Sequence, residues 1–346
     1  MQLGKTNLTI SSIGLGCMSM SEFYGNPLAK DKAIDLIKLA FKQGINFFDT
    51  ADVYGFGSNE ELIGKAVEAL INENVKRKDL IIASKCGILR DKHNVSKRGI
   101  DNSYKYIKQA CEKSLVRLGN SIKYIDLYYI HRIEKNITDT KIKEAMQAFA
   151  ELLAENKIKA VGLSESSASV IKKAHEFLLE LTNNKHGLAA VQSEYSLLTR
   201  SVESNGVLET CNNLGITFVA YSPLSRALLS GSLDVKKLDD KDFRKTLPRF
   251  QQENLDYNQK LVDVVNKLAL EKNCKTSQIA LAWVMAQKNV VPIPGTTKEE
   301  NLLSNIKAQK IVLSKADLTR LNNIGETKGY RYTESVMHTY GLDDEI

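Results

Sequence analysis

The sequence predicts an α/β protein of the (β/α)8 barrel class, with a short N-terminal β-hairpin and long loops. Short apolar runs alternate with longer amphipathic stretches, and the alternation repeats eight times. Alternating strands and helices predict a parallel sheet, and eight such units close into a barrel. The alternative is an open doubly wound sheet, which usually has GxGxxG after its first strand. Only Gly14 and Gly16 are present there, so we expect residues 1–346 to form one barrel domain.

The expected strands are the short apolar runs, which are typical of buried strands when turn residues bound them. In chain order they span residues 11–16, 45–50, 80–85, 124–131, 160–164, 189–196, 216–224 and 290–297. The residues before the first strand resemble a hairpin.

Each expected helix has apolar residues three and four positions apart, which places them on one face. The helices span residues 31–44, 58–70, 106–119, 142–156, 167–181, 207–215, 258–273 and 298–308. Gly44 is suited to end the first helix. Ser58 and Glu61 have the spacing of a capping box, so we expect them to cap the second.

Composition and cysteine usage indicate an ordinary globular protein. The chain is 43% hydrophobic, which is enough for a large core without a disulfide or a structural metal. The number of cysteines is odd and no pair is spaced CxxC, so we expect reduced thiols and no metal site. The cysteines are Cys17, Cys86, Cys111, Cys211 and Cys274. With neither a secretory signal nor a long apolar span, the expected location is the cytoplasm.

The net charge of +7 is modest. Lysines are scattered among acidic residues and do not cluster with aromatic ones, so we expect no nucleic-acid partner and no membrane association. A phosphate-bearing cofactor is compatible with this charge. The expected assembly is a monomer or a weak homo-oligomer.

Polar side chains end three consecutive expected strands. Asp49, Lys85 and His131 each follow an apolar run, and Tyr54 lies five residues beyond Asp49. Because active sites of barrels lie at the carboxyl ends of the strands, we expect these four side chains to converge. Taken singly, each has an ordinary interpretation. Asp49 could be a turn or helix-cap residue, Lys85 a surface lysine, His131 a hydrogen-bonded core histidine and Tyr54 a packed core residue.

The motifs around these residues resemble those of the aldo-keto reductases, in family order from Gly14 to Asn305. They are GLGCMSMS, FFDTADVYGFGSNEELIGKA, SKCG, YIDLYYIHR, AVGLSE, VQSEYSLLTR, VAYSPLSRALLSG, PRFQQENL, ALAWVMAQ and VPIPGTTKEENLLSN. These motifs are most similar to those of the branch that holds plant auxin-induced-type and microbial NADPH-dependent reductases.

By this resemblance, Asp49, Tyr54, Lys85 and His131 form a catalytic tetrad that reduces aldehydes or ketones to alcohols. Tyr54 is the general acid, which such a reaction needs at the carbonyl oxygen. We expect the Lys85 ammonium to lower the pKa of Tyr54, because a nearby positive charge favours the phenolate. Asp49 is expected to hold Lys85, and His131 to orient the carbonyl.

The resemblance also implies NADPH as cofactor. Ser164 and Gln192 match residues that hold the nicotinamide amide, and Tyr221 matches the aromatic side chain that stacks on the nicotinamide ring. Lys298 adds a cation near a helix start, where phosphate binds, and so favours the 2′-phosphate of NADPH. The full expected set is Met18, Ser164, Gln192, Tyr221, Ser222, Pro223, Leu224, Arg226, Leu228, Ser230, Gly231, Gly295, Thr296, Thr297, Lys298, Asn301 and Asn305.

Capping, core packing and solvated charge remain the alternative readings for these cofactor residues. The pattern also departs from the family at Ser304, where an acidic residue is usual, and Asn301 stands where many relatives have glutamine. Either Arg244 or Arg249, in the long loop after the seventh strand, is expected near the cofactor.

The substrate is expected to be a small carbonyl compound, and the loops of a barrel set its identity. The candidate loops are residues 87–99, 232–254 and 329–346. Met18, Phe23 and Tyr24, after the first strand, either line an apolar wall of the substrate site or simply pack in their loop.

Two other functions remain open. The first is a regulatory subunit that senses NADPH, as the related potassium-channel β subunits do, and such proteins can keep the tetrad. The second is a barrel isomerase or lyase, which would not explain Tyr221 and the phosphate-binding end. Cys86, beside Lys85, is either a reactive thiolate or, more simply, a small filler at a strand end.

Overall fold

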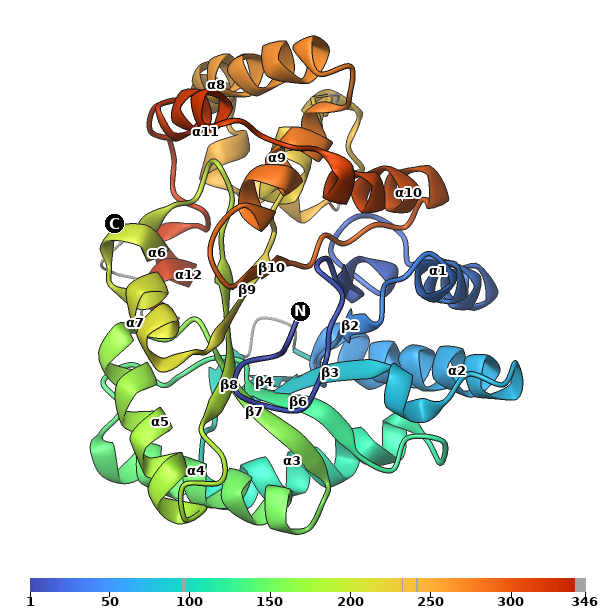
Figure 1. Ribbon diagram of the computed structural model, residues 1–346, viewed down its shortest axis with the longest axis vertical. Helices are drawn as coiled ribbons and strands as arrows, with labels where there is room; N and C mark the ends of the chain where they lie inside the picture. Colours follow the sequence, from blue (N-terminus) through green and yellow to red (C-terminus); the bar gives the residue numbers. More distant parts are fainter. Residues whose placement is uncertain (95–97, 232, 241, 340–346) are drawn as a thin grey trace.

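The computed structural model describes residues 1–94, 98–231, 233–240 and 242–339. Eight parallel strands form one curled sheet in the order β1-β2-β3-β6-β7-β8-β9-β10 (Figure 1). Their bounds are β1 Leu15–Gly16, β2 Phe47–Asp49, β3 Ile81–Cys86, β6 Ile125–Ile130, β7 Ile158–Ser164, β8 Leu188–Glu194, β9 Thr217–Tyr221 and β10 Val290–Pro292. A parallel bridge between Gly16 and Gly295 joins the first strand to the last. The expected (β/α)8 architecture is confirmed, and each strand lies within its predicted segment or overlaps it.

The helices surround the sheet, and all eight expected ones are present (Figure 1). They are α1 Lys30–Lys42, α2 Ser58–Asn72, α3 Tyr104–Leu118, α4 Asp139–Ala154, α5 Ala168–Leu181, α7 Val207–Leu214, α8 Gln252–Glu271 and α10 Glu299–Lys307. Further helices that the sequence reading did not predict are α6 Ser201–Ser204, α9 Thr276–Met285, α11 Lys315–Asn322 and α12 Glu334–Thr339. Nearly every residue of α9 is buried, so it lacks the one-sided apolar pattern by which a surface helix is recognised.

The capping box expected at α2 is wrong. The helix begins at Ser58 itself, and its cap is Gly57, which makes no side-chain bond. Gly57 has a φ of +93°, and a Cβ there would lie 2.4 Å from Cδ of Arg117. Glycine is therefore needed at this position both for the left-handed backbone and for the close approach of Arg117.

The predicted N-terminal hairpin closes one end of the barrel. Gln2 and Thr9 form an antiparallel bridge, and Leu3 and Ile10 are buried. They pack with side chains of the barrel interior, including Phe47 at the start of β2. The amino-terminal ends of the strands are thus covered, which leaves the carboxyl ends for a site.

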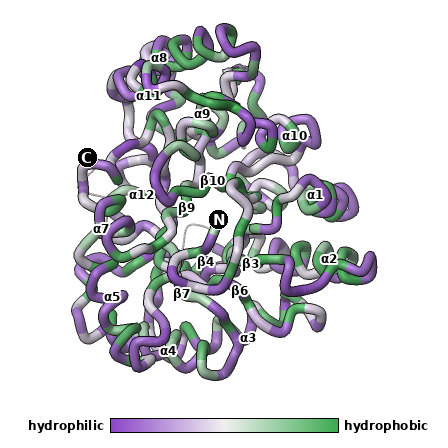
Figure 2. Tube along the Cα trace, viewed as in Figure 1, coloured by the Kyte–Doolittle hydropathy of each residue, from purple (hydrophilic) through white to green (hydrophobic). Residues whose placement is uncertain are grey.

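Apolar side chains fill the barrel and the layer between strands and helices. Figure 2 shows hydrophobic and hydrophilic residues alternating along the outer helices, as expected when only one face of each packs inward. Within the described ranges, no helix has both the length and the apolar character needed to cross a membrane.

Two of the expected long loops contain structure of their own. The loop after β3 carries an antiparallel pair, β4 Ile88–Arg90 and β5 Arg98–Ile100. The loop after β9 carries four 3-10 turns between Ser225 and Phe250, and its Phe243 N–H donates to Phe23 O at 3.2 Å. The second loop therefore reaches past β10 to the segment after β1.

Candidate active site

Asp49 and Lys85 form a buried ion pair at the carboxyl end of the barrel. Asp49 ends β2 and Lys85 lies in the adjacent β3. The Lys85 ammonium donates to Asp49 Oδ1 at 2.5 Å, to Thr50 O at 2.8 Å and to the Tyr54 hydroxyl at 3.3 Å. Its three donors thus have three partners, which is the full capacity of an ammonium group. Burying this charge is tolerable only because it is paired in this way.

The turn after β2 places Tyr54 beside Lys85. The Asp52 N–H donates to Lys85 O at 3.1 Å, which holds the turn against β3. Tyr54 begins a short 3-10 segment, Tyr54–Gly57. Its ring meets the ring of His131 edge to face, with centroids 5.5 Å apart. The four side chains expected to converge therefore do so.

The pKa of Tyr54 differs from the sequence expectation. Burial raises it to about 12, although the nearby Lys85 ammonium acts in the opposite direction. The expected net lowering of this pKa is wrong. Removing the phenolate from water destabilises it more than the Lys85 ammonium, which is already paired with Asp49, stabilises it. The phenol is therefore protonated at neutral pH.

The other titratable groups have well-defined charge states. Burial disfavours charge on Lys85, but Asp49 and Tyr54 more than offset it and raise the pKa of the ammonium. Burial, together with Lys85 and Arg132, holds the pKa of His131 well below its usual value. His131 is therefore a neutral imidazole, and its Nδ1 has no hydrogen-bond partner among the described residues. Burial also raises the pKa of Cys86 well above its usual value, which contradicts the reactive-thiolate reading.

Ser164 and Gln192 lie side by side, as the last residue of β7 and its register partner in β8. Gln192 Nε2 donates to Asp49 Oδ2 at 2.8 Å, so the amide also holds the carboxylate of the buried pair. Tyr221 ends β9, and its hydroxyl lies 3.1 Å from that of Tyr332. These three expected nicotinamide contacts thus line one rim of the mouth.

The loop after Tyr221 has an unusual backbone. Ser222, Ser225, Arg226 and Ala227 have φ values of +47°, +45°, +54° and +77°. Left-handed non-glycine residues are costly, and they gather at functional sites. Successive N–H groups in such turns form concave sites for anions. The other expected cofactor residues of this loop are Pro223, Leu224, Leu228, Ser230 and Gly231.

The remaining expected cofactor residues lie along the seam between the first and last strands. Met18 is half-buried in the turn after β1, and Gly295 pairs with Gly16. The segment Gly295, Thr296, Thr297, Lys298 leads into α10, where Thr296 Oγ1 accepts from the Lys298 N–H at 3.1 Å. Lys298 and Asn301 are exposed and Asn305 is buried. The Ser304 hydroxyl is buried without a hydrogen-bond partner among the described residues.

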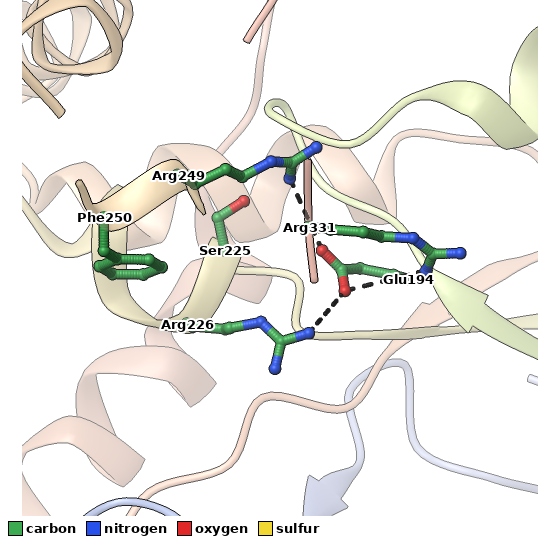
Figure 3. A pocket seen from close by; sticks show the side chains of 6 residues that line it. All are labelled: Glu194, Ser225, Arg226, Arg249, Phe250 and Arg331. Carbon is green, nitrogen blue, oxygen red and sulfur yellow. Dashed lines mark hydrogen bonds and ion pairs between the residues drawn. The ribbon is translucent and has the colours of Figure 1, made fainter. Parts of the chain in front are cut away.

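A cluster of charged residues lies above β7, β8 and β9, and the sequence pointed to only two of its members, Arg226 and Arg249. The arginine–glutamate cluster comprises Arg132, Glu165, Glu194, Arg226, Arg249 and Arg331. In Figure 3, three of its guanidinium groups point toward the Glu194 carboxylate, with N–O distances of 2.9, 3.7 and 3.8 Å. The sequence offered only a weak signal for this cluster. Arg132, Glu165 and Glu194 stand at the carboxyl ends of expected strands, as His131 does.

The cluster is tightly packed: the space beside Glu194, Arg226 and Arg331 is too small to admit a water molecule. Of the two loop arginines expected near the cofactor, Arg249 belongs to the cluster, while Arg244 pairs with Asp242 at 2.7 Å. Arg226 is paired with Glu194, so it must exchange partners or share its donors to contact a phosphate.

Comparisons with known proteins identify the family of the chain. The model of the aldo/keto reductase family matches residues 12–326. A probable aldo-keto reductase 1 from Glycine max is 40% identical over 341 residues, which cover 97% of this chain and 92% of the relative.

Solved structures agree as well. The glycerol dehydrogenase of Gluconobacter oxydans has a TM-score of 0.80 at 26% identity, covering 93% of this chain and 94% of its own. An aldo-keto reductase of Bacillus halodurans in its holo form has a TM-score of 0.73 at 26% identity, covering 95% and 97%. A thermostable aldo-keto reductase in complex with the inhibitor epalrestat has a TM-score of 0.71 at 29% identity, covering 94% and 99%. The chain belongs to the aldo/keto reductase family, whose members are oxidoreductases that act on small carbonyl compounds with a nicotinamide cofactor.

Proposed function

We propose that this protein is an NADPH-dependent reductase of aldehydes or ketones in which Tyr54 donates the proton. The observation that carries the proposal is the contact between the Tyr54 hydroxyl and the buried Lys85–Asp49 pair. A phenol that is protonated at neutral pH, with a fixed ammonium at 3.3 Å, is suited to protonate an oxygen that gains negative charge.

Each side chain has a separate role in this proposal. The bound nicotinamide supplies the hydride that the carbonyl carbon accepts. Tyr54 gives its proton to the carbonyl oxygen, and Lys85 stabilises the phenolate that remains. Asp49 keeps Lys85 charged and in place. His131, a neutral imidazole, donates a hydrogen bond that orients the carbonyl.

Three features of the chain fit a nicotinamide nucleotide. Ser164 and Gln192 offer a hydroxyl and an amide on adjacent strands, which suit the carboxamide of the ring. The left-handed residues between Ser222 and Ala227 suit the pyrophosphate. The exposed Lys298 at the start of α10 suits the 2′-phosphate, which is the basis for proposing NADPH over NADH.

The decisive experiment compares wild type with Tyr54→Phe. NADPH absorbance is followed with a panel of carbonyl compounds that includes a nitrobenzaldehyde, and NADPH binding is measured separately. We expect turnover by the wild type and a loss of about 10²-fold or more in Tyr54→Phe, with binding retained. An unchanged rate in the variant would refute the role of Tyr54.

The same panel of carbonyl compounds distinguishes a carbonyl reductase from an NADPH-sensing subunit. A wild-type protein that binds NADPH but reduces none of the compounds would instead be an NADPH-sensing subunit. For the cofactor choice, Lys298→Ala should bring the affinities for NADPH and NADH closer together. An unchanged ratio would contradict the phosphate assignment.

We further propose that residues 1–346 act as one domain, as a monomer or weak homo-oligomer, in the cytoplasm. The location is supported by the five free thiols, four of them buried. Sedimentation across a range of protein concentrations tests the oligomeric state.

A further inference from the structure

The segment between α11 and α12 brings two side chains back into the barrel mouth. Arg331 and Tyr332 are only 3% and 9% exposed. The residues before them are tied down at successive points: the Thr327 hydroxyl donates to Leu198 O at 2.9 Å, and the Lys328 N–H donates to Asn258 Oδ1 at 2.9 Å. The approach of this segment to the mouth is therefore fixed by the loop after β8 and by α8.

Arg331 is anchored by the arginine–glutamate cluster. It donates two hydrogen bonds to the Glu165 carboxylate, at 2.9 and 2.7 Å, and lies 3.8 Å from Glu194. Burial alone would raise the pKa of Glu165, but Arg331 and Arg132 outweigh it and hold that pKa far below its usual value. A bidentate arginine–carboxylate pair of this kind fixes the plane of the guanidinium group as well as its position. Figure 3 shows Arg331 reaching this cluster from a segment distant in sequence from Glu194.

The anchored pair holds Tyr221 by its hydroxyl. Arg331 Nη1 donates to the Tyr221 oxygen at 3.3 Å, and the Tyr332 hydroxyl lies 3.1 Å from the same oxygen. Arg132 Nη2 in turn donates to the Tyr332 hydroxyl at 3.5 Å. The ring of Tyr332 lies under the Arg226 guanidinium, at 4.7 Å. Phenylalanine at position 221 would have the same ring but would lose both of these contacts.

We propose that Arg331 and Tyr332 are positioning residues, which orient the ring of Tyr221 for the nicotinamide of the cofactor. This inference rests on the proposed function, in which that ring stacks on Tyr221. A ring that is already fixed loses less conformational freedom when the cofactor binds, so fixing it in advance strengthens binding. Tyr221 is only half-buried, so part of its ring remains open to a ligand at the mouth.

The test uses the full-length variants Tyr221→Phe and Tyr332→Phe, each of which removes one hydroxyl and keeps its ring. Calorimetry gives the dissociation constants for NADP⁺ and for 2′-phospho-ADP-ribose, which has the phosphates but no nicotinamide. Tyr332→Phe should bind NADP⁺ about twofold to tenfold more weakly, the range expected for one hydrogen bond, and Tyr221→Phe, which also loses the contact with Arg331, should bind it at least as weakly. Each should bind 2′-phospho-ADP-ribose as the wild type does.

The double variant tests whether the two hydroxyls act together. Since both single changes break the same bond, the double variant should bind NADP⁺ little more weakly than the weaker single variant. Tyr257→Phe is the control, because Tyr257 packs against Lys328 of the same segment, with the ammonium 4.6 Å from its ring centroid. It should bind both nucleotides as the wild type does.

The outcomes separate this inference from the proposed function. A wild type that binds neither nucleotide refutes the proposed function itself. Wild-type affinity for NADP⁺ in Tyr221→Phe or Tyr332→Phe refutes only the positioning role. Equal weakening for both nucleotides also refutes it, since the effect would then not involve the nicotinamide ring.

Discussion

Replacing Lys85 by methionine tests whether the Asp49–Lys85 pair is held as charged groups inside the barrel. The change leaves the Asp49 carboxylate, 3% exposed, with Gln192 as its remaining side-chain partner. Removing one member of a buried pair costs about 3–5 kcal/mol, because the other charge stays buried and uncompensated. We therefore expect a large loss of stability as well as of activity.

The thermal shift follows from the length of the chain. With about 2.1 cal/mol/K of unfolding entropy per residue, 346 residues give about 0.7 kcal/mol/K. The midpoint of unfolding should then fall by about 4–7 °C in Lys85→Met. Lys267→Met, at an exposed position of α8, is the matched control and should shift it by less than about 1 °C.

The double variant Asp49→Asn/Lys85→Met separates stability from chemistry. With both charges gone, no buried ion lacks a partner, so most of the lost stability should return. Carbonyl reduction should not return, because Tyr54 still lacks the neighbouring ammonium. Calorimetric melting and NADPH absorbance measure the two properties. A double variant as unstable as Lys85→Met, or a Lys85→Met protein that melts with the wild type, would refute the reasoning.

Three further predictions concern stability. Burial raises the pKa of Asp52 to about 8. Between about pH 4 and pH 8 the folded protein therefore binds more protons than the unfolded chain, and its stability falls as the pH rises. The melting temperature of Asp52→Asn should exceed that of the wild type by an amount that grows across this range, and a constant difference would contradict the raised pKa. Nearby guanidinium groups outweigh the burial of Glu165 and hold its pKa far below its usual value, so its contribution to stability is full above about pH 4 and declines progressively as the pH falls from there towards the lowered pKa. The stability deficit of Glu165→Gln relative to the wild type should therefore be smaller at pH 3 than at pH 7, and an equal deficit at both would speak against the ion pair. A Cβ at Gly64 in α2 would lie 2.1 Å from the carbonyl oxygen of Leu118 in α3, so Gly64→Ala should lower the free energy of unfolding in urea by about 1–3 kcal/mol. Gly99→Ala is the control and should cost much less, because a Cβ there meets only ordinary contacts at 3.7 Å. Equal effects would mean that α2 and α3 separate easily.

The sequence predicted the barrel and the four converging residues because both depend on local patterns. Alternating apolar periods identify strands and helices, and the carboxyl ends of parallel strands lie at one end of a barrel. Asp49, Lys85 and His131 could therefore be chosen from their positions alone. The helix α9 could not, since it is apolar on all sides and its pattern has no period to detect.

The partners of Tyr221 could not be predicted for a different reason. Arg331 and Glu165 are 166 residues apart in the chain, and no periodicity relates an arginine in a tail to a glutamate after a strand. Their pairing depends on the path of the segment around α8, which tertiary packing sets. The capping box at Ser58 is wrong for a more local reason: Gly57, with a φ of +93°, takes the cap position, and α2 begins at Ser58 itself.

The pKa of Tyr54 shows why the residue types of a site do not determine its electrostatics. The sequence supplies a phenol and an ammonium, and their attraction alone predicts a lowered pKa. Burial reverses the sign, and its extent is known only once the barrel is built. For the proposed reaction the reversal is useful: the phenol keeps its proton until the carbonyl oxygen gains charge, and Lys85 then stabilises the phenolate as it forms. A tyrosine with a pKa near neutrality would instead be partly ionised before the substrate arrived, and that fraction could not donate.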